Sequence, residues 1–172
     1  MTKPRVLILS WEYPPIVEGG LARHVRKLSE QLVATGSAEV HVLTRGDDTS
    51  PTEEDMDGVH VHRVVEPSRP RDLSEFITWI EHMNSDLLAA GVELGDRFEF
   101  DLVHGHDWLV ASAGDHLAKR FRCPLVMTVH ATEYGRHQGW VQDHPQSHIH
   151  GVERWMTNRA DRVIACSAYM RD

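Results

Sequence analysis

The chain alternates short, continuous apolar runs with longer segments in which apolar residues recur every three or four positions. Continuous runs are typical of strands covered on both faces, and the recurring pattern predicts amphipathic helices. The predicted strands cover residues 6–9, 39–44, 59–65, 101–106, 124–129 and 161–165. The predicted helices begin near residues 21, 73 and 110, and another passes through residues 152–156. This alternation predicts an α/β fold with a doubly wound, mostly parallel sheet flanked by helices.

Three local patterns predict how the edges and ends of these elements behave. Residues 45–57 are polar and acidic, so we expect a solvent-exposed excursion between two strands. The alternation in residues 59–65 predicts an edge or half-exposed strand, with His60 and His62 on its wet side. Gly91 follows the last apolar positions of the second helix, and we expect the helix to end there.

The composition is that of an ordinary globular domain. The chain has 172 residues, of which 41% are hydrophobic and 26% charged, so we expect one domain with one core. Its 18 Lys and Arg residues are outnumbered by 26 Asp and Glu, which gives a net charge of -8. Because binding to phosphate backbones needs a clustered positive field, we expect no nucleic-acid partner.

The cysteines and the two ends of the chain indicate in which cellular compartment the protein is expected. Cys123 and Cys166 have no metal or redox spacing, so we expect buried, free thiols in a reducing compartment. The apolar run at residues 6–9 is too short for a signal peptide or a membrane span. We therefore expect a cytoplasmic protein with no membrane partner. A helix predicted after Ser167 is cut off at Asp172, which suggests a fragment of a longer chain.

Three loops with unusual residues follow three of the predicted strands. They carry Gly19 and Gly20, the segment 104–108, and the segment 130–136. Because the carboxyl ends of parallel strands lie on one edge of a sheet, we expect these loops to converge on a single cleft.

The glycine pair directly precedes a predicted helix. Backbone N–H groups of Gly19 and Gly20, together with the positive end of the helix dipole, would suit a phosphate or diphosphate. A pair needed only for a tight turn remains an alternative. The spacing is not G-x-G-x-x-G, so the main support for a dinucleotide cofactor is missing.

The segment after the fourth strand carries the strongest chemistry. His106 can donate to or accept from a sugar hydroxyl, and Asp107 can orient its partners. For His104 we expect a core imidazole bonded to a backbone carbonyl. A serine hydrolase is disfavoured because the chain has no G-x-S-x-G motif.

A metal site is the competing interpretation of these histidines. His104, His106 and Asp107 could bind a metal ion, but the sequence specifies no further ligand. Four further histidines fit no H-E-x-x-H or comparable signature: His137, His144, His148 and His150. We therefore expect no metal.

Four motifs, in this order, resemble a known family. They are SWEYPP at residues 10–15, EGGL at 18–21, VHGHDW at 103–108 and TVHATE at 128–133. They are similar to the N-terminal domain of retaining GT-B glycosyltransferases of family 4, the glycogen-synthase-like group. The resemblance covers nearly the whole chain. It implies that residues 1–172 are an acceptor-side, Rossmann-like domain and that a C-terminal, donor-binding domain is absent from this chain.

The resemblance also implies an activity and a set of site residues. Such enzymes transfer glucose from UDP-glucose or ADP-glucose to an α-glucan acceptor with retention at the anomeric carbon, without a metal ion or other cofactor. By motif position, Gly20 would lie near the donor diphosphate, and His106 near the transferred glucose as the catalytic residue. The substrate-binding set would comprise Gly19, Gly20, Asp107, Trp108, His130, Glu133 and Arg136. Because the C-terminal half is absent, we expect the fragment alone to be inactive.

One departure from the family pattern leaves the donor open. Bacterial glycogen synthases that use ADP-glucose carry Lys-x-Gly-Gly, whereas Val17 and Glu18 precede Gly19 here. Two other functions also stay open. One is another family 4 transferase, such as a mannosyltransferase acting on a lipid, and the other is a non-catalytic module that binds sugars or nucleotides.

Overall fold

The sheet is built around β1 (Arg5–Leu9), whose Leu7, Ile8 and Leu9 side chains are fully buried. The computed structural model describes residues 3–66, 68, 70 and 72–171. The other strands are β2 (Glu39–Gly46), β3 (Glu53–Met56), β4 (Val59–Val65), β5 (Leu102–His106), β6 (Leu125–Val129) and β7 (Arg162–Ala165). The described residues form one seven-stranded sheet in the order β3-β4-β2-β1-β5-β6-β7. All neighbouring pairs in it are parallel except β3 with β4.

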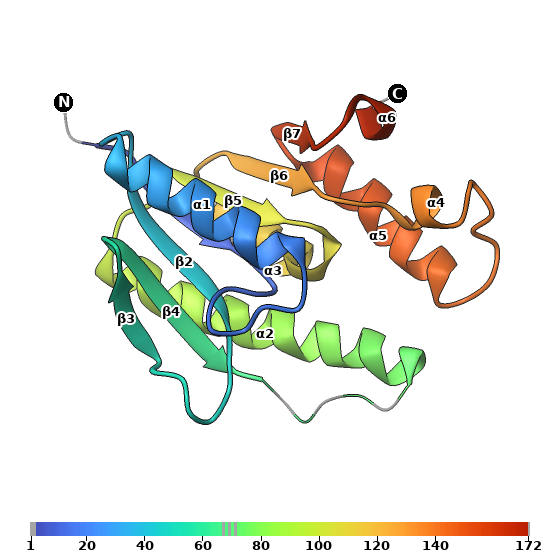
Figure 1. The fold of residues 1–172 in the computed structure, drawn as a ribbon, viewed down its shortest axis with the longest axis horizontal. Coiled ribbons are helices and arrows are strands. Elements are labelled where there is room, and N and C mark those ends of the chain that lie inside the picture. Colours follow the sequence, from blue (N-terminus) through green and yellow to red (C-terminus); the bar gives the residue numbers. More distant parts are fainter. Residues whose placement is uncertain (1–2, 67, 69, 71, 172) are drawn as a thin grey trace.

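Helices cover both faces of the sheet, as Figure 1 shows. They are α1 (Gly20–Ala34), α2 (Leu73–Arg97), the 3-10 turn η1 (Trp108–Val110), α3 (Ala111–Phe121), α4 (Glu133–Arg136), α5 (Gln146–Arg159) and α6 (Ala168–Arg171). One apolar cluster joins α1 to the sheet, and a larger one joins α2, α3 and α5 to the opposite face. The predicted doubly wound α/β fold is therefore confirmed. Along the described residues, no helix combines the length and the apolar character needed to cross a bilayer.

The chain changes direction at β1. It first winds outward from β1 to β2 and β4, and then returns through α2 to place β5 on the other side of β1. The loops that follow β1 and β5 therefore leave neighbouring strands toward opposite faces of the sheet. In open α/β sheets this switch point is where a crevice forms. It is also where the first two predicted functional loops meet.

The prediction of a solvent-exposed excursion at residues 45–57 is wrong in part. β2 continues to Gly46, and the Arg45 side chain is fully buried, with its guanidinium 4.4 Å from the centre of the Trp11 ring. Arg45 Nε also donates to the Trp11 carbonyl oxygen at 2.9 Å. A buried guanidinium needs such partners, and the polar pattern alone does not reveal them.

The prediction that residues 59–65 form an edge strand with wet histidines is also wrong in part. β3 pairs antiparallel with β4 and takes the edge position. His62 is only 7% exposed, and its Nε2 lies 3.0 Å from Nδ1 of the buried His41. His60 is half-buried. The alternation correctly places His60 and His62 on one face, but α2 covers that face.

The predicted end of the second helix at Gly91 is wrong, because α2 continues to Arg97. A Cβ atom added at Gly91 would lie 2.5 Å from Leu117 Cδ1, and one at Gly95 would lie 2.2 Å from the Phe121 ring. These glycines therefore serve close packing between α2 and α3, instead of ending the helix.

The prediction of two buried thiols holds only in part. Cys123 is half-buried in the structure, whereas Cys166 is exposed. Cys166 directly follows β7, an edge strand on which Val163 and Ile164 are also largely exposed. An apolar neighbourhood in sequence does not bury a residue when its strand has a neighbour on one side alone.

The packing role of Gly91 predicts opposite effects of alanine at two helical glycines. Gly91→Ala should lower the free energy of unfolding by about 1–2 kcal/mol, because the clash with the fully buried Leu117 outweighs the better helix propensity. Gly151→Ala on α5 is the matched control, since a Cβ there meets no described atom within 4 Å. It should raise stability by up to about 1 kcal/mol. Urea unfolding of both variants measures the difference, and equal signs would contradict the packing role.

Candidate functional site

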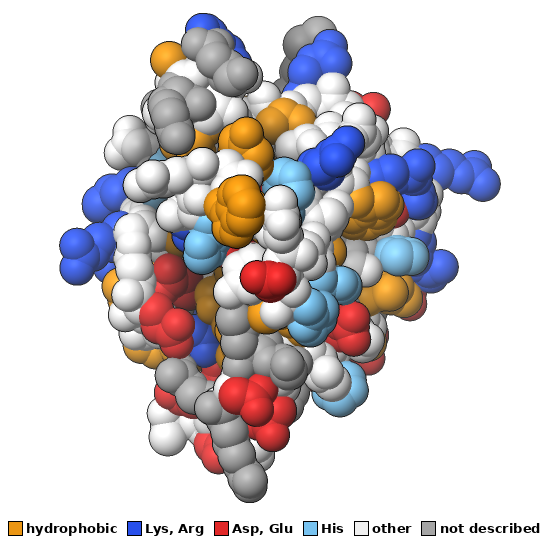
Figure 2. Space-filling view, turned by 90° about the vertical axis from the view of Figure 1, so that its right-hand side faces the viewer, with side chains coloured by type: hydrophobic (Ala, Val, Ile, Leu, Met, Phe, Trp, Pro, Cys, Tyr) orange, Lys and Arg blue, Asp and Glu red, His pale blue; other side chains and the backbone are white. Residues whose placement is uncertain are grey.

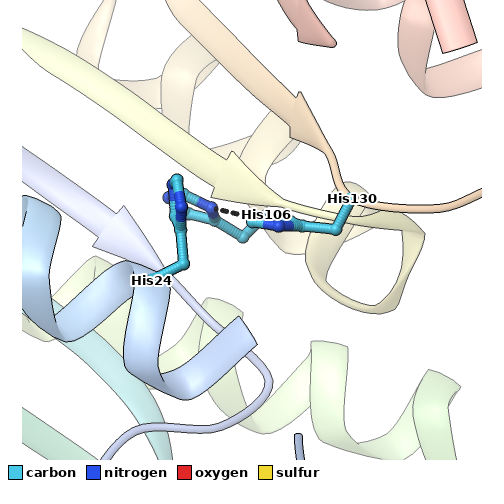
Figure 3. Close-up of side chains that lie close together, drawn as sticks. All are labelled: His24, His106 and His130. Atoms are coloured by element: carbon cyan, nitrogen blue, oxygen red, sulfur yellow. Dashed lines mark hydrogen bonds between the residues drawn. The ribbon is translucent and has the colours of Figure 1, made fainter. Parts of the chain in front are cut away.

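Three histidines from three separate elements meet at the carboxyl edge of the sheet. His24 lies in the second turn of α1, His106 ends β5, and His130 directly follows β6. Figure 3 shows their rings converging. Side chains alternate along β5, so His106 points to the face covered by α1, the same face as Leu102. The switch point thus brings His106 against α1.

Direct contacts hold this cluster together. His106 Nδ1 lies 3.0 Å from His130 Nε2, so one of these two nitrogens donates to the other. The His24 ring meets the His130 ring edge to face, with centres 4.8 Å apart, and its centre is 5.7 Å from that of His106. His104, two residues earlier on β5, shares a hydrogen bond of 2.7 Å between its Nε2 and Thr128 Oγ1. The predicted bond from His104 to a backbone carbonyl is therefore wrong.

Burial keeps these imidazoles neutral. His106 is fully buried, and its pKa is lowered well below 6.5 by desolvation and by the neighbouring His104, His130 and His24. Desolvation also lowers the pKa values of His104 and His130 to about 4. At neutral pH these rings therefore act as hydrogen-bond donors, acceptors or ligands, and not as cations. His106 Nε2 has no hydrogen-bond partner among the described residues.

Asp107 braces the loops that carry His106 and His130. Its backbone has a φ of 62°, a left-handed conformation that turns the chain sharply away from β5. Its N–H donates to the Thr128 carbonyl oxygen at 2.9 Å, and its Oδ1 accepts from the His130 N–H at 2.7 Å. Burial raises the pKa of this carboxyl to about 6. The side chain is 7% exposed and faces the protein.

The glycine loop is held from inside by Glu12. The buried Glu12 carboxylate accepts from the backbone N–H groups of Gly19, at 3.0 Å, and of Glu18. The Gly19 N–H predicted to face a phosphate is therefore already bonded. Gly20 lies on the open side, where an added Cβ would meet no described atom within 4 Å.

Glu18, the residue after the departure at Val17, holds the glycine loop in place. Its carboxylate pairs with the buried Arg45, with Arg45 Nη2 2.6 Å from Glu18 Oε1. Where the family pattern has the second residue of Lys-x-Gly-Gly, this chain has an anchor that ties the loop to β2.

The predicted pair Glu133 and Arg136 lies on the single-turn helix α4. The buried Glu133 carboxylate accepts from Arg136 Nη1 at 2.7 Å, and its Oε2 lies 3.1 Å from His137 Nε2. The Arg136 side chain is about half exposed. The Glu133 N–H donates to the carboxylate of Glu153 on α5, at 2.9 Å.

The structure does not bring Trp108 together with the three histidines. Trp108 lies in the apolar cluster formed with α2, α3 and α5, where its ring meets Phe76 edge to face. It lines a groove of about 460 Å³. The residues of this groove include Ile77, Asn84, Ser112, His148 and Trp155. By contrast, α1 begins at Gly20 and contacts His106 and His130 through His24.

Sequence reasoning missed His24 and Glu153. His24 lies four residues after Gly20, a spacing that places both on one face of a helix. Glu153 lies between Ile149 and Met156 at helical spacing, which puts a carboxylate on the buried stripe of α5. Both signals are weak, because many helices carry such residues without consequence.

Figure 2 shows the face that includes these loops, seen from the right-hand side of Figure 1. Histidine, acidic and basic side chains are mixed on it, with separate hydrophobic ones between them. Near α4, Tyr134 is 56% exposed and Trp140 is 70% exposed. Exposed aromatic rings beside polar groups suit the stacking of sugar rings.

Two sets of three side chains in the described residues lie close enough to hold a metal ion. They are His24, His106 and His130, and, at a separate place on the sheet, Glu39, His41 and His60. The set of possible metal ligands suggested by the sequence is a different one, His104, His106 and Asp107. In the structure His104 is bonded to Thr128 and Asp107 to the backbone of His130.

The family described as "Glycosyl transferase 4-like domain" has a sequence model that matches residues 19–172. The chain is 41% identical to the glycogen synthase of Mycobacterium tuberculosis, over 98% of this chain and 43% of that protein. It is 30% identical to the D-inositol 3-phosphate glycosyltransferase of Nocardiopsis dassonvillei, over 86% of this chain and 35% of that protein. The chain thus spans less than half the length of the curated relatives it matches.

Among solved structures, the fold is similar to sucrose-phosphate synthase from Thermosynechococcus elongatus. The TM-score is 0.75 at 22% identity, over 98% of this chain and 45% of that chain. At this identity the likeness concerns the fold alone. It agrees with the fold predicted from the sequence, a mostly parallel, Rossmann-like sheet flanked by helices, as found in GT-B glycosyltransferases.

The buried carboxyl of Glu153 predicts a dependence of stability on pH. Desolvation raises its pKa to about 7 in the folded state, against about 4.5 in the unfolded chain. Folding therefore retains a proton that the unfolded chain releases, and stability from this group is lost as the pH rises from about 4.5 to about 7.

A neutral side chain at position 153 removes this loss. Glu153→Gln keeps an oxygen that can accept from the Glu133 N–H, so its advantage in unfolding free energy over the wild type should grow by up to about 3 kcal/mol between pH 4.5 and pH 8. Urea unfolding across this range measures it. Glu93→Gln, at an exposed position on α2, is the matched control and should show no such trend. A Glu153→Gln advantage that is equal at both ends of the range would contradict the buried-proton account.

Proposed function

The chain belongs to the glycosyl transferase 4-like family, and on this premise we propose that it is the N-terminal, acceptor-side half of a retaining GT-B glycosyltransferase. The reaction we propose is transfer of glucose from UDP-glucose or ADP-glucose to an α-glucan. The 41% identity to a glycogen synthase supports the acceptor class. The partner that completes the site is the C-terminal, donor-binding half of the parent chain.

The observation that carries this proposal is the meeting of α1 with His106 at the switch point. The open glycine Gly20 begins α1, and His24 on the same helix touches His106 and His130. An exposed helix start suits the negative charge of a donor diphosphate, and imidazoles suit sugar hydroxyls. Both chemistries thus lie within about one helical turn of each other.

We assign His106 the catalytic role in this reaction. Its ring is neutral at pH 7, so it would hydrogen-bond a hydroxyl of the transferred glucose without adding charge. Such a bond accelerates the reaction if it strengthens as charge develops on the sugar ring. The ring is fully buried, and the exposed His24 ring lies 5.7 Å from it between centres, so contact with substrate requires neighbouring side chains such as His24 to move.

Of the remaining residues, some shape the donor side of the site and others hold its loops in place. Gly19 and Gly20 shape the donor side, with Glu12 fixing the Gly19 N–H. Asp107 holds the His130 backbone in place and acts on the substrate through it.

On the acceptor side, His130 and the half-exposed Arg136 have groups that can reach sugar hydroxyls, while Glu133 orients Arg136. Trp108 would contact an acceptor only along the groove between α2, α3 and α5. We propose that the transfer itself needs no metal ion or other cofactor, since the start of α1 would offset part of the diphosphate charge.

A second candidate function follows from another relative. The 30% identity to a D-inositol 3-phosphate glycosyltransferase supports a small phosphorylated acceptor as the alternative to a glucan. Assays of the full-length protein with each acceptor, and with UDP-glucose and ADP-glucose as donors, discriminate the two. Transfer to the small acceptor but not to an α-glucan would replace the first candidate by the second.

His106→Ala in the full-length protein should lower turnover by about two orders of magnitude or more, the scale of losing a positioned hydrogen-bonding group at a reacting centre. His82→Ala, at an exposed position on α2, is the matched control and should retain the wild-type rate. Rates from initial product formation, with circular dichroism to verify folding, decide the matter. A folded His106→Ala protein with near-normal turnover would remove His106 from the catalytic role.

Residues 1–172 alone should transfer no glucose, because nucleotide contacts are assigned to the missing half. A radiolabelled donor assay on this fragment, with the full-length protein as the positive control, checks the point. Transfer by the fragment at a rate comparable to the full-length protein would contradict the division of the site between two halves.

A further inference from the structure

We propose that the imidazoles of His24, His106 and His130 form a binding site for a borderline-soft divalent cation such as Zn²⁺, and that a bound ion blocks the site by occupying His106. The binding stands on the geometry of the cluster. The inhibition by a bound ion rests on the proposed function, since it requires that the site catalyse a transfer reaction.

The spacing of the nitrogens fits a tetrahedral ion. Zn–N bonds of about 2.0–2.1 Å at tetrahedral angles put ligand nitrogens about 3.3 Å apart. His106 Nδ1 and His130 Nε2 are 3.0 Å apart, and all three side chains offer a nitrogen within 4.8 Å of the others. His24 has to move closer by up to about 1.5 Å, the difference between 4.8 Å and about 3.3 Å, which an exposed side chain on a helix surface can do by changing rotamer.

The chemistry of the cluster favours a metal ion over a proton. Three imidazoles without a carboxylate favour zinc, copper, nickel or cobalt over magnesium or calcium. Burial keeps His106 and His130 neutral at pH 7, so their lone pairs are available. One of the two nitrogens in the hydrogen bond between His106 and His130 carries a proton. For that nitrogen to bind an ion, its proton moves to the other nitrogen of the same ring.

The buried ring of His106 also has an unused position. His106 is 0% exposed, and its Nε2 has no hydrogen-bond partner in the part of the chain that is described. A buried polar nitrogen left without a partner costs about 1–3 kcal/mol. One ring gives an ion one nitrogen, so Nε2 is the alternative to Nδ1 as the ligand atom of His106.

The surroundings support the cluster as a site. The Asp107 carboxylate holds the His130 backbone, and His130 Nδ1 lies 3.7 Å from Cys166 Sγ, so both the loop and the ring of His130 have an outer support. His24 is exposed, which leaves the fourth position of the ion open to water or substrate.

The second set of potential ligands is a poorer site and a useful control. Its Glu39 carboxylate is held by both Nε and Nη2 of Arg5, at 2.6 and 3.0 Å, and this cation would repel a metal ion. His41 is already bonded to His62 through Nδ1. Removing His60 from this set should therefore leave metal binding unchanged.

Cobalt titration of the full-length protein tests the site without any activity. After removal of bound metal by a chelator, Co²⁺ should bind one ion per chain and give the visible absorption of a four-coordinate ion. His24→Ala should weaken binding by at least about 100-fold, since one of three ligands is lost. His60→Ala should bind like the wild type. Failure of the wild type to bind, equal binding by His24→Ala, or loss of binding in His60→Ala would each overturn the site.

Inhibition by Zn²⁺ tests the blocking. Each variant is compared with its own rate without zinc, so an effect of His24→Ala on the basal rate does not enter. Zinc should inhibit transfer by the wild type and His60→Ala at the concentration where zinc displaces cobalt, and by His24→Ala only at concentrations at least about 100-fold higher. Zinc that binds through His24 and leaves the rate unchanged would overturn the blocking. Absence of transfer with every donor and acceptor would instead refute the proposed function, and the cobalt titration would still decide the site.

Discussion

Parallel pairing of β1 with β2 on one side and β5 on the other is the constraint on which the candidate site depends. The pairing places Leu9, the last residue of β1, level with Gly105, one residue before the end of β5, and level with Leu43 of β2, which continues to Gly46. Burying side chains such as Leu7 and Leu9 contributes about 1.5–3 kcal/mol each, which firmly sets this level. Because β1 feeds α1 on one face and β5 leads to η1 and α3 on the other, the loops diverge and leave room for chemistry between them.

The same burial determines the chemical character of the cluster. Three imidazoles in water would titrate near neutral pH, but here the sheet and α1 remove water from His104, His106 and His130 and hold their pKa values far lower. Asp107 experiences the opposite effect, since burial raises the pKa of a carboxyl. The buried imidazoles are therefore uncharged at neutral pH. This suits the recognition of hydroxyls, and it also keeps the imidazoles available to a metal ion.

Long-range polar contacts hold the glycine loop in place. Glu12 bonds backbone N–H groups within the loop, and Glu18 is tied to Arg45, which is itself buried against Trp11. Arg45 is buried and Glu18 is about half exposed, and the buried guanidinium is stable because it pairs with a carboxylate and also donates to a carbonyl oxygen. Arg45 begins a polar stretch that looks like surface in the sequence, but it lies near the end of β2 and contributes the anchor for the donor side of the site.

The sequence by itself determined the alternation of elements, because the period of apolar residues is a local property that each segment carries. It also determined that the glycine loop, His106 and His130 leave the same edge, since this follows from parallel strands. The tertiary structure decided which polar residues are buried. Arg45 and Glu153 find partners far away in the chain, Gly91 continues a helix because Leu117 packs on it, and His24 reaches the site. Such contacts join residues distant in sequence, and no local pattern encodes which partner a side chain will meet.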